Sequence, residues 1–241
     1  MHAGTVEGAG AALAYRETGC GRSVAVVHDV AADAATWAPE LERLGGRAIA
    51  YDRRGYGAST APEGYAATTV EEQAEDLAAL LHALDAAQAV LLGDGFGGLV
   101  ALDVAKRHPA LVASLVLADV PLYAFVPAAT RVMAEQRSAL EAALRAGGRP
   151  AAVAAYLDGR AGPEQLGRAQ AAAPAFFADY AGLSSWPVTR RELRGLGVAA
   201  VVLTRSGARA HVVAAADALA ALMPAASRVL DGDPVAAAAA A

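Results

Sequence analysis

Cysteine and surplus positive charge are both scarce in this chain. Of its 241 residues only Cys20 is a cysteine, so the chain can close no disulfide on itself and build no thiolate cluster for a metal. Its 20 lysines and arginines are outnumbered by 25 aspartates and glutamates, which leaves a net charge of −5. Because nucleic acids and anionic membranes bind basic surfaces, we expect neither as a partner.

Long apolar segments and targeting signals are missing as well. No run approaches the roughly 18 apolar residues of a membrane span, and residues 1–4 lack the basic and then apolar order of a secretory signal. We therefore expect a cytoplasmic protein. Its composition, 56% hydrophobic and 19% charged, is that of a globular chain with a sizeable core. A homodimer is compatible with it and is left open.

Short β-branched runs alternate along the chain with helical patterns. This alternation is typical of an α/β protein with a mainly parallel sheet covered by helices. The clearest helix covers residues 68–85, with Thr68 and Glu71 as a capping box at its start. Strands are expected at residues 11–16, 23–28, 47–51, 90–92, 113–118, 199–204 and 228–230.

Residues 121–194 differ in texture from the segments on either side. They are rich in alanine and arginine, are interrupted by prolines, and show no strand pattern. We therefore predict an α/β core made of residues 1–120 and 195–241, with a helical cap inserted at 121–194.

The strongest local motif is a strand, a glycine turn and a helix. The expected strand 90–92 is followed by Gly-Asp-Gly-Phe-Gly-Gly at residues 93–98 and then by a helix. A nucleophile elbow needs small residues on both sides of the nucleophile, because the turn is strained and the helix passes close beneath it. In the pattern G-x-Ser-x-G, Gly93 and Gly97 are the flanking glycines, so the middle position is Gly95.

Three stretches of the chain resemble one known family. Val26–Asp29 matches the His-Gly oxyanion loop of the α/β-hydrolases, residues 51–59 are close to their D-x-R-G-x-G-x-S motif, and the glycine turn is their elbow. From Tyr15 to about Leu230 the chain resembles α/β-hydrolases of the lipase, esterase and epoxide-hydrolase kind. The resemblance implies the α/β-hydrolase fold, a mostly parallel twisted sheet of about eight strands flanked by helices, with the helical cap above the site.

The residues that this resemblance requires for hydrolysis are missing. The family's nucleophile maps to Gly95, its acid to Ala208 and its histidine roughly to Val235, and no histidine follows His211. Losing the nucleophile or histidine of such a triad lowers turnover by on the order of a million-fold. The resemblance therefore implies a divergent α/β-hydrolase without its catalytic triad, in which ordinary serine-hydrolase chemistry is not expected.

Two aspartates near the elbow are candidate catalytic residues. Asp29 replaces the glycine of the His-Gly pair, and it either tolerates an unusual turn conformation or presents a carboxylate to the site as a general acid or base. Asp94 either accepts backbone N–H bonds at the helix N-terminus or becomes a displaced nucleophile if the turn shifts by one residue. His28 is a weaker candidate, because in the family this histidine is mostly structural.

The backbone N–H groups of Val30 and Phe96 are the expected oxyanion donors. Without a nucleophile, such donors still stabilise an enolate or alkoxide, which suits lyase, isomerase or cyclase chemistry with Asp29 or Asp94 moving the proton. We therefore favour a non-hydrolytic enzyme, narrowly ahead of a ligand- or partner-binding protein without turnover. A hydrolase with a displaced aspartate nucleophile is the third alternative.

A small apolar metabolite is the expected ligand. The aromatic side chains expected to line its pocket are Trp37, Tyr123, Phe125, Tyr156 and Trp186, although aromatic residues in such positions equally form plain core. No spacing of histidines, cysteines or carboxylates predicts a metal site, and the elbow accounts for the glycine-rich stretch 93–98. We therefore expect neither a metal nor a cofactor.

Overall fold

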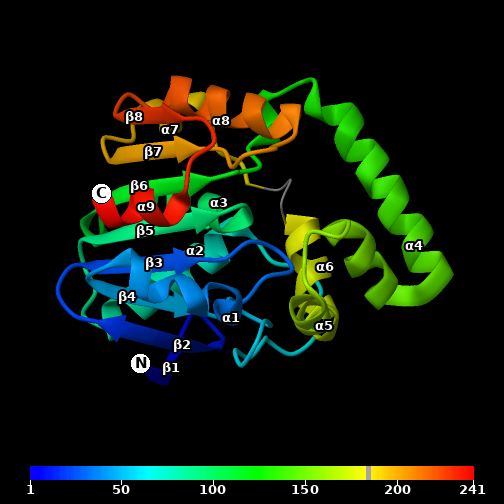
Figure 1. Ribbon diagram of the computed structural model, residues 1–241, viewed down its shortest axis with the longest axis horizontal. Coiled ribbons are helices and arrows are strands. Elements are labelled where there is room, and N and C mark those ends of the chain that lie inside the picture. Colours follow the sequence, from blue (N-terminus) through cyan, green and yellow to red (C-terminus); the bar gives the residue numbers. More distant parts are fainter. Residues whose placement is uncertain (183–185) are drawn as a thin grey trace.

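The computed structural model describes residues 1–182 and 186–241 of the chain. These residues form one eight-stranded sheet in the order β1-β2-β4-β3-β5-β6-β7-β8 (Figure 1). The strands are β1 (His2–Glu7), β2 (Ala12–Gly19), β3 (Ser23–Val27), β4 (Arg47–Tyr51), β5 (Ala89–Asp94), β6 (Val112–Ala118), β7 (Ala199–Leu203) and β8 (Ala226–Val229).

The strands from β4 across to β8 all run parallel, whereas β1 and β2 are antiparallel to their neighbours. The predicted α/β sheet of about eight mostly parallel strands is thereby confirmed. The sequence does not predict β1, because the segment His2–Glu7 is short in β-branched and aromatic residues. This strand is held by a six-residue ladder to β2.

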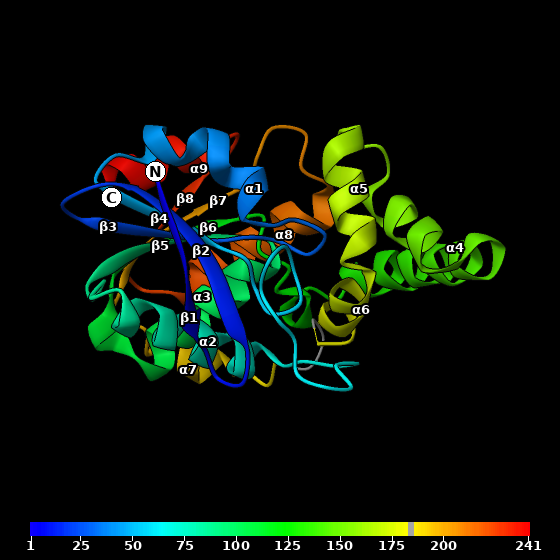
Figure 2. The same cartoon turned by 90° about the horizontal axis from the view of Figure 1, so that it is seen from below.

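Helices cover both faces of the sheet (Figure 2). The helices α2, α3, α7 and α8 contribute to the hydrophobic core on one face, and α1, η1 and α9 contribute to the core on the other. The α-helices are α1 (Ala34–Trp37), α2 (Val70–Ala83), α3 (Phe96–Arg107), α4 (Ala129–Leu157), α5 (Pro163–Ala171), α6 (Ala173–Gly182), α7 (Arg190–Arg194), α8 (Ala210–Leu222) and α9 (Pro234–Ala240). Three 3₁₀ turns join them, η1 (Ala38–Leu44), η2 (Pro109–Leu111) and η3 (Tyr123–Phe125).

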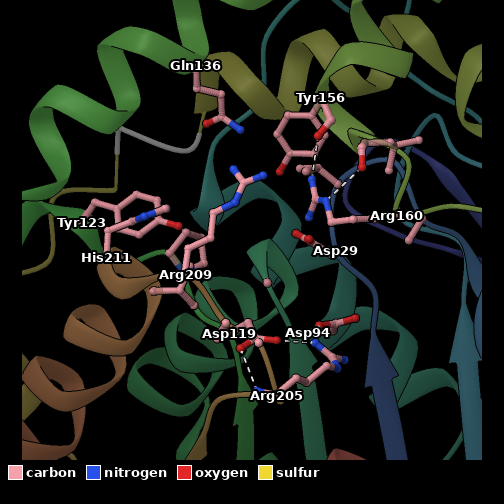
Figure 3. Close-up of a pocket in the computed structure, with 18 of the residues that line it drawn as sticks. Asp29, Asp94, Asp119, Tyr123, Gln136, Tyr156, Arg160, Arg205, Arg209 and His211 are labelled. Carbon is pink, nitrogen blue, oxygen red and sulfur yellow. Dashed lines mark hydrogen bonds and ion pairs between the residues drawn. The ribbon is translucent and has the colours of Figure 1, made fainter. Parts of the chain in front are cut away.

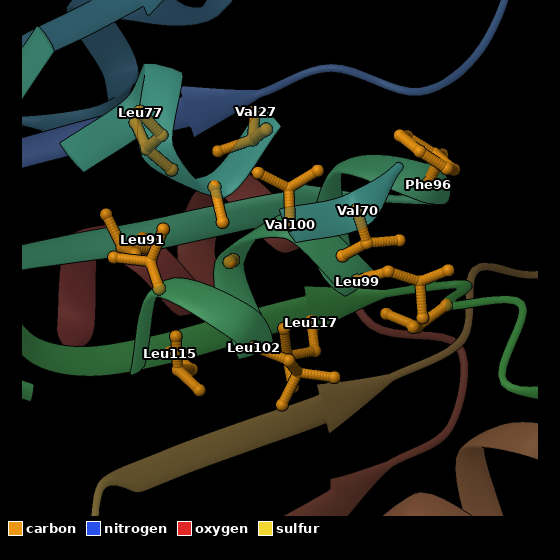
Figure 4. Close-up of a cluster of buried hydrophobic side chains, with 14 of the residues drawn as sticks. Val27, Val70, Leu77, Leu91, Phe96, Leu99, Val100, Leu102, Leu115 and Leu117 are labelled. Carbon is orange, nitrogen blue, oxygen red and sulfur yellow. The ribbon is translucent and has the colours of Figure 1, made fainter. Parts of the chain in front are cut away.

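The central strand β5 is buried on both faces, which explains its unbroken apolar sequence. Leu91 belongs to the core beneath α2 and α3, where it lies among Leu77 and Val100 (Figure 4). Val90 and Leu92 point the other way, into the core beneath η1 and α9. None of the described helices has both the length and the apolarity needed to cross a bilayer.

Several element boundaries differ by a few residues from the sequence prediction, and the chain ends in a helix that the sequence analysis does not predict. The capping box of α2 lies one residue further along, because Thr69 has the extended backbone of an N-cap and exchanges hydrogen bonds with Glu72. The final alanines form α9, which packs Val235 and Ala238 into the core on the η1 face of the sheet.

A layer of helices lies beyond the carboxyl ends of the parallel strands (Figure 1). It consists of α4, α5 and α6, and α4 is broken at Gly147 and Gly148, whose backbone is not helical. These helices fall in the segment for which the sequence predicts a cap. The short helix α7, which that segment also includes, contacts α8 on the core instead.

A buried ion pair connects α6 to the core. The Arg53 guanidinium donates to the Asp179 carboxylate at 2.7 Å, with side chains that are 1% and 0% exposed. Tyr56 and Gln73 donate to the same carboxylate, each at 2.7 Å. Arg53 also donates to the backbone carbonyl of Asp29 at 3.2 Å. The helical layer is therefore tied directly to the loop that carries Asp29.

We predict that Asp179→Asn lowers the free energy of unfolding by about 3–5 kcal/mol, because it leaves the buried Arg53 without its counter-ion. Urea denaturation measures this loss. Glu135→Gln, which removes an exposed carboxylate paired with Arg131 on α4, is the matched control, with an expected change below about 1 kcal/mol. Equal effects of the two substitutions would contradict an anchoring role for Asp179.

Candidate active site

The elbow turns at Gly95. Strand β5 ends at Asp94, α3 begins at Phe96, and Gly95 between them has φ 51° and ψ −119°. These angles are those of the first corner of a type II′ turn, which favours glycine. The Gly95 N–H donates to the Ala118 carbonyl at 2.9 Å and fixes the corner there. The one-residue shift that a nucleophilic Asp94 requires is therefore not observed.

The flanking glycines are required by close packing of backbone on backbone. A Cβ on Gly93 would overlap the Cα of Gly98, and a Cβ on Gly97 would overlap the Val27 carbonyl oxygen. The sequence prediction that the helix passes close beneath the turn is confirmed. The glycine pattern is thus explained by the backbone of the elbow, whatever residue stands at its corner.

The carboxyl group of Asp29 occupies the space above Gly95. A Cβ built on Gly95 would overlap the Asp29 carboxyl carbon and both of its oxygens. The Phe96 N–H donates to Asp29 Oδ1 at 2.8 Å, and the Val30 N–H is bonded to the same carboxylate. The two backbone donors expected from the sequence are therefore bound to a side chain of the protein itself.

An unusual backbone conformation does not explain why an aspartate stands at position 29. Among the described residues, Ala31 adopts a positive φ of 57° in this loop, whereas Asp29 does not. Burial raises the pKa of Asp29 to about 6, and the neighbouring charge of Asp94 adds to the rise. Hydrogen bonds from the Phe96 and Val30 N–H groups act in the opposite direction. Asp29 is thus a carboxyl group that titrates close to neutral pH.

Asp94 is held by a guanidinium and not by backbone N–H groups. Arg205 donates to the carboxylates of Asp94 and Asp119, both at 2.7 Å, and its backbone N–H donates to Asp119 at 3.1 Å. The interpretation of Asp94 as an acceptor of backbone N–H bonds at the start of α3 is wrong, because no side chain caps the N-terminus of this helix. Burial raises the pKa of Asp94, and Arg205 opposes this rise. Nowhere in the described chain do three histidine, cysteine or carboxylate residues form a group that could hold a metal.

His28 supports the backbone of the site from below. The Arg53 N–H donates to its Nε2 at 3.0 Å, so the proton lies on Nδ1, which donates to the Asp29 carbonyl at 2.8 Å. Burial lowers the pKa of His28 well below its usual value and keeps the ring neutral. His28 is not among the residues that line the cavity above Asp29, which is described next. Its role is structural.

A cavity of about 460 Å³ lies above Asp29, between the strand ends and the helical layer (Figure 3). Tyr123 and Tyr156 line it, as the sequence predicts, and Ala208 lies in its wall. The other lining residues include Val30, Thr36, Asp94, Gly95, Asp119, Met133, Gln136, Leu157, Arg160, Gln165, Arg205, Arg209 and His211.

The remaining residues predicted for the pocket lie elsewhere. Trp37 belongs to the core on the η1 face, and Val235 packs in that same core. The Trp186 indole N–H donates to buried Asp103 at 3.0 Å, and Phe125 lies beneath the Arg190 guanidinium at 5.2 Å. The tertiary contacts of these large side chains, which sequence spacing does not specify, direct them away from the cavity.

Three arginines in the cavity wall were not predicted. Arg205 is paired with two aspartates, Arg209 pairs with Asp158 at 2.9 Å, and Arg160 donates to the carbonyls of Tyr156 and Leu157. In Figure 3, Arg160 lies above Asp29 in the view. No local motif distinguishes these arginines from the others in the sequence, because their places depend on how the loops fold over the sheet.

Comparisons with known proteins agree with this architecture. A family model described as alpha/beta hydrolase fold matches residues 23–145. The chain is 35% identical over 155 residues to 2-(acetamidomethylene)succinate hydrolase of Mesorhizobium japonicum, covering 61% of this chain and 52% of the relative. It is 36% identical over 103 residues to an epoxide hydrolase of Caballeronia sordidicola, covering 42% and 31%. The chain thus spans about half or less of these curated relatives.

A solved structure is similar to this chain over a longer stretch. An alpha/beta hydrolase from Sphaerobacter thermophilus is similar with a TM-score of 0.79 and 26% sequence identity. The match covers 94% of this chain and 91% of that chain.

We predict that Asp94→Asn lowers the pKa of Asp29, because it removes a neighbouring negative charge and leaves the Arg205 guanidinium less neutralised. The ¹³C resonance of the Asp29 carboxyl, followed by NMR against pH, is expected to titrate near 6 in the unaltered protein. Asp217→Asn, on the outer side of α8, is the control and leaves the midpoint in place. A midpoint at the ordinary value of about 4 would show that Asp29 is solvated.

We predict that Gly95→Ser destabilises the protein by about 2 kcal/mol or more, because its Cβ collides with the Asp29 carboxyl group at a strained backbone position. In the double variant Asp29→Gly/Gly95→Ser the collision is absent, and much of the loss is expected to be recovered. Urea unfolding of the two single variants and the double variant measures this coupling. Strictly additive effects would disprove the steric exclusion.

Proposed function

The chain belongs to the α/β-hydrolase fold family, and from this premise we propose that it is a member without a working hydrolytic triad, in which Asp29 moves a proton. Its reactions are of the lyase, isomerase or cyclase type, on a small molecule bound in the cavity above Asp29. The position of the Asp29 carboxyl group, over the glycine at the elbow corner, is the observation that carries this proposal.

The absence of triad chemistry is supported at three positions. Gly95 has no side chain to attack a substrate, and Ala208 has no carboxylate to orient a histidine. Val235, near which the histidine is expected, packs into the core on the η1 face and not into the cavity. Hydrolysis by a serine mechanism requires all of these groups to act together.

General base catalysis by Asp29 is supported by its environment. A base works best when its pKa lies near the pH of operation, and the pKa of Asp29 is raised to about 6. Its Oδ1 is anchored on the Phe96 N–H, and Asp29 lines the cavity. We propose that Asp29 removes a proton from a carbon next to a carbonyl group. The proton then returns at another carbon of the enolate, or a group on the β-carbon departs with its bonding electrons as the C=C bond forms and takes the proton from Asp29.

Two tyrosine hydroxyls can donate hydrogen bonds to the negative charge that develops on the substrate carbonyl oxygen. The backbone donors of Phe96 and Val30 are already bound to Asp29, so a substrate oxygen must find other partners. Tyr123 and Tyr156 line the same cavity. Burial raises the pKa of Tyr123 to about 12 and also raises that of Tyr156 well above its usual value, so both hydroxyls stay protonated and can donate.

Binding without turnover is a second candidate, and one observation favours it. The backbone N–H groups that would stabilise an oxyanion are bonded to Asp29, so one of the protein's own side chains blocks the oxyanion site. In this case a bound ligand is recovered chemically unchanged. The small apolar ligand and the homodimer both stay predictions. The charged residues of the cavity wall favour a ligand that also carries a polar group.

We predict that the protein catalyses exchange of α-protons of simple ketones such as 2-pentanone in D₂O, roughly 100-fold or more above buffer. Exchange, measured by ¹H NMR, is expected to rise with pH through a midpoint near 6, because the ionised form of Asp29 is the base. Asp29→Asn abolishes it and the surface control Asp217→Asn does not. Exchange that survives in Asp29→Asn, or ketone binding without exchange, would remove Asp29 from catalysis.

We predict that p-nitrophenyl acetate is hydrolysed only at the buffer rate, by the unaltered protein and by Gly95→Ser alike. The serine variant still lacks an activating histidine, and Asp29 occupies the space beside it. Release of p-nitrophenol is followed by absorbance. Clear turnover that is lost in Asp94→Ala would instead establish a hydrolase with a displaced nucleophile.

A further inference from the structure

A second cavity lies beside the one above Asp29. It measures about 350 Å³ and lies between the core loops 31–33 and 55–57 and the side of α5 that runs from Gln165 to its C-cap, Ala172. Ala32 and Gln165 line both cavities. Because Asp29 and Val30 line the first cavity, the single loop 29–33 runs from the catalytic carboxylate to the wall of the second.

The wall of this second cavity consists mainly of small apolar residues. Five of its eleven lining residues are alanine and two are glycine. Such a wall offers mostly methyl groups and backbone, together with the larger side chains of Tyr56, Gln165 and Arg168. It contrasts with the first cavity, whose wall carries three aspartates and three arginines.

Three of the four polar side chains around the second cavity, those of Asp33, Tyr56 and Arg168, are engaged with other protein groups, and the fourth, Gln165, lies at the border with the first cavity. The Tyr56 hydroxyl donates to Asp179 at 2.7 Å, so its ring is what remains for the cavity. Arg168 donates to Asp33 at 2.7 Å, and the other Asp33 oxygen accepts from the Thr36 N–H at 2.9 Å. A polar ligand group would have to compete with these bonds, whereas an alkyl group leaves them in place.

We propose that the second cavity binds the alkyl tail of the ligand whose carbonyl end lies at Asp29. This assignment rests on the function proposed above and adds the substrate class, a small carbonyl compound with a flexible hydrocarbon chain. The tail passes Ala32 and Gln165 and lies against the alanines of α5. Its affinity comes from apolar surface removed from water, which grows with each methylene group.

Binding of a series of methyl ketones tests this assignment. Dissociation constants of 2-pentanone, 2-heptanone and 2-nonanone are measured by ligand-observed NMR for the unaltered protein. Each added methylene is expected to lower the dissociation constant by about two- to fourfold. In Ala172→Trp, which places a large ring in the second cavity, the gain per methylene disappears while 2-pentanone binds within about twofold. Ala142→Trp, on an exposed position of α4, is the matched control and keeps the gain.

Two results would overturn the tail site. A flat dependence on chain length in the unaltered protein is one, and an undiminished dependence in Ala172→Trp is the other. If Ala172→Trp does not fold, Ala171→Phe at the exposed end of the same wall replaces it. Binding is measured without turnover, so the tail site stands if Asp29 exchanges no proton. It falls by itself if exchange depends on Asp29 but chain length has no effect.

Discussion

The guanidinium of Arg53 is the fixed point on which the site depends. It donates to the carbonyls of His28 and Asp29 on the core loop, at 2.9 and 3.2 Å, and to Asp179 on the helical layer at 2.7 Å. A buried ion pair of this kind adds little net stability compared with apolar packing, but breaking it is costly, so it enforces one arrangement. Here that arrangement fixes the backbone that carries Asp29 and ties α6 above it to the core.

A steric exclusion then defines the chemistry. The Asp29 carboxyl group and a side chain at position 95 cannot share the space above the elbow. On our proposal the carboxylate takes the place of both a nucleophile and a bound oxyanion, since it also accepts from the Phe96 and Val30 N–H groups. Burial and the nearby charge of Asp94 keep its pKa near neutral, while Arg205 neutralises Asp94 and Asp119. The elbow of a hydrolase thus supports a carboxyl group suited to proton transfer.

The two cavities divide the work of recognition. Charged and phenolic groups surround the space above Asp29, where we propose that bonds change and charge develops. The neighbouring space is lined mainly by alanine and glycine, and the side chains of Asp33, Tyr56 and Arg168 beside it are already paired. A ligand with a carbonyl head and a hydrocarbon tail matches both environments, because each part meets groups of its own polarity. The apolar second space is what suits the largely apolar metabolite expected from the sequence, because the first space is lined with charged groups.

The sequence by itself determined the sheet, the elbow and the empty corner at Gly95, because strand periodicity and glycine spacing are local and leave a direct pattern. It also marked Asp29 and Asp94 as the unusual residues. Only the tertiary structure decided what these residues contact: Asp29 meets Phe96 from 67 positions away, and Arg205 reaches Asp94 across 111. The same holds for Trp37 and Trp186, which sequence placed in the pocket and packing placed elsewhere. Contacts of this range depend on how loops and helices pack over the sheet, and no spacing along the chain encodes that packing.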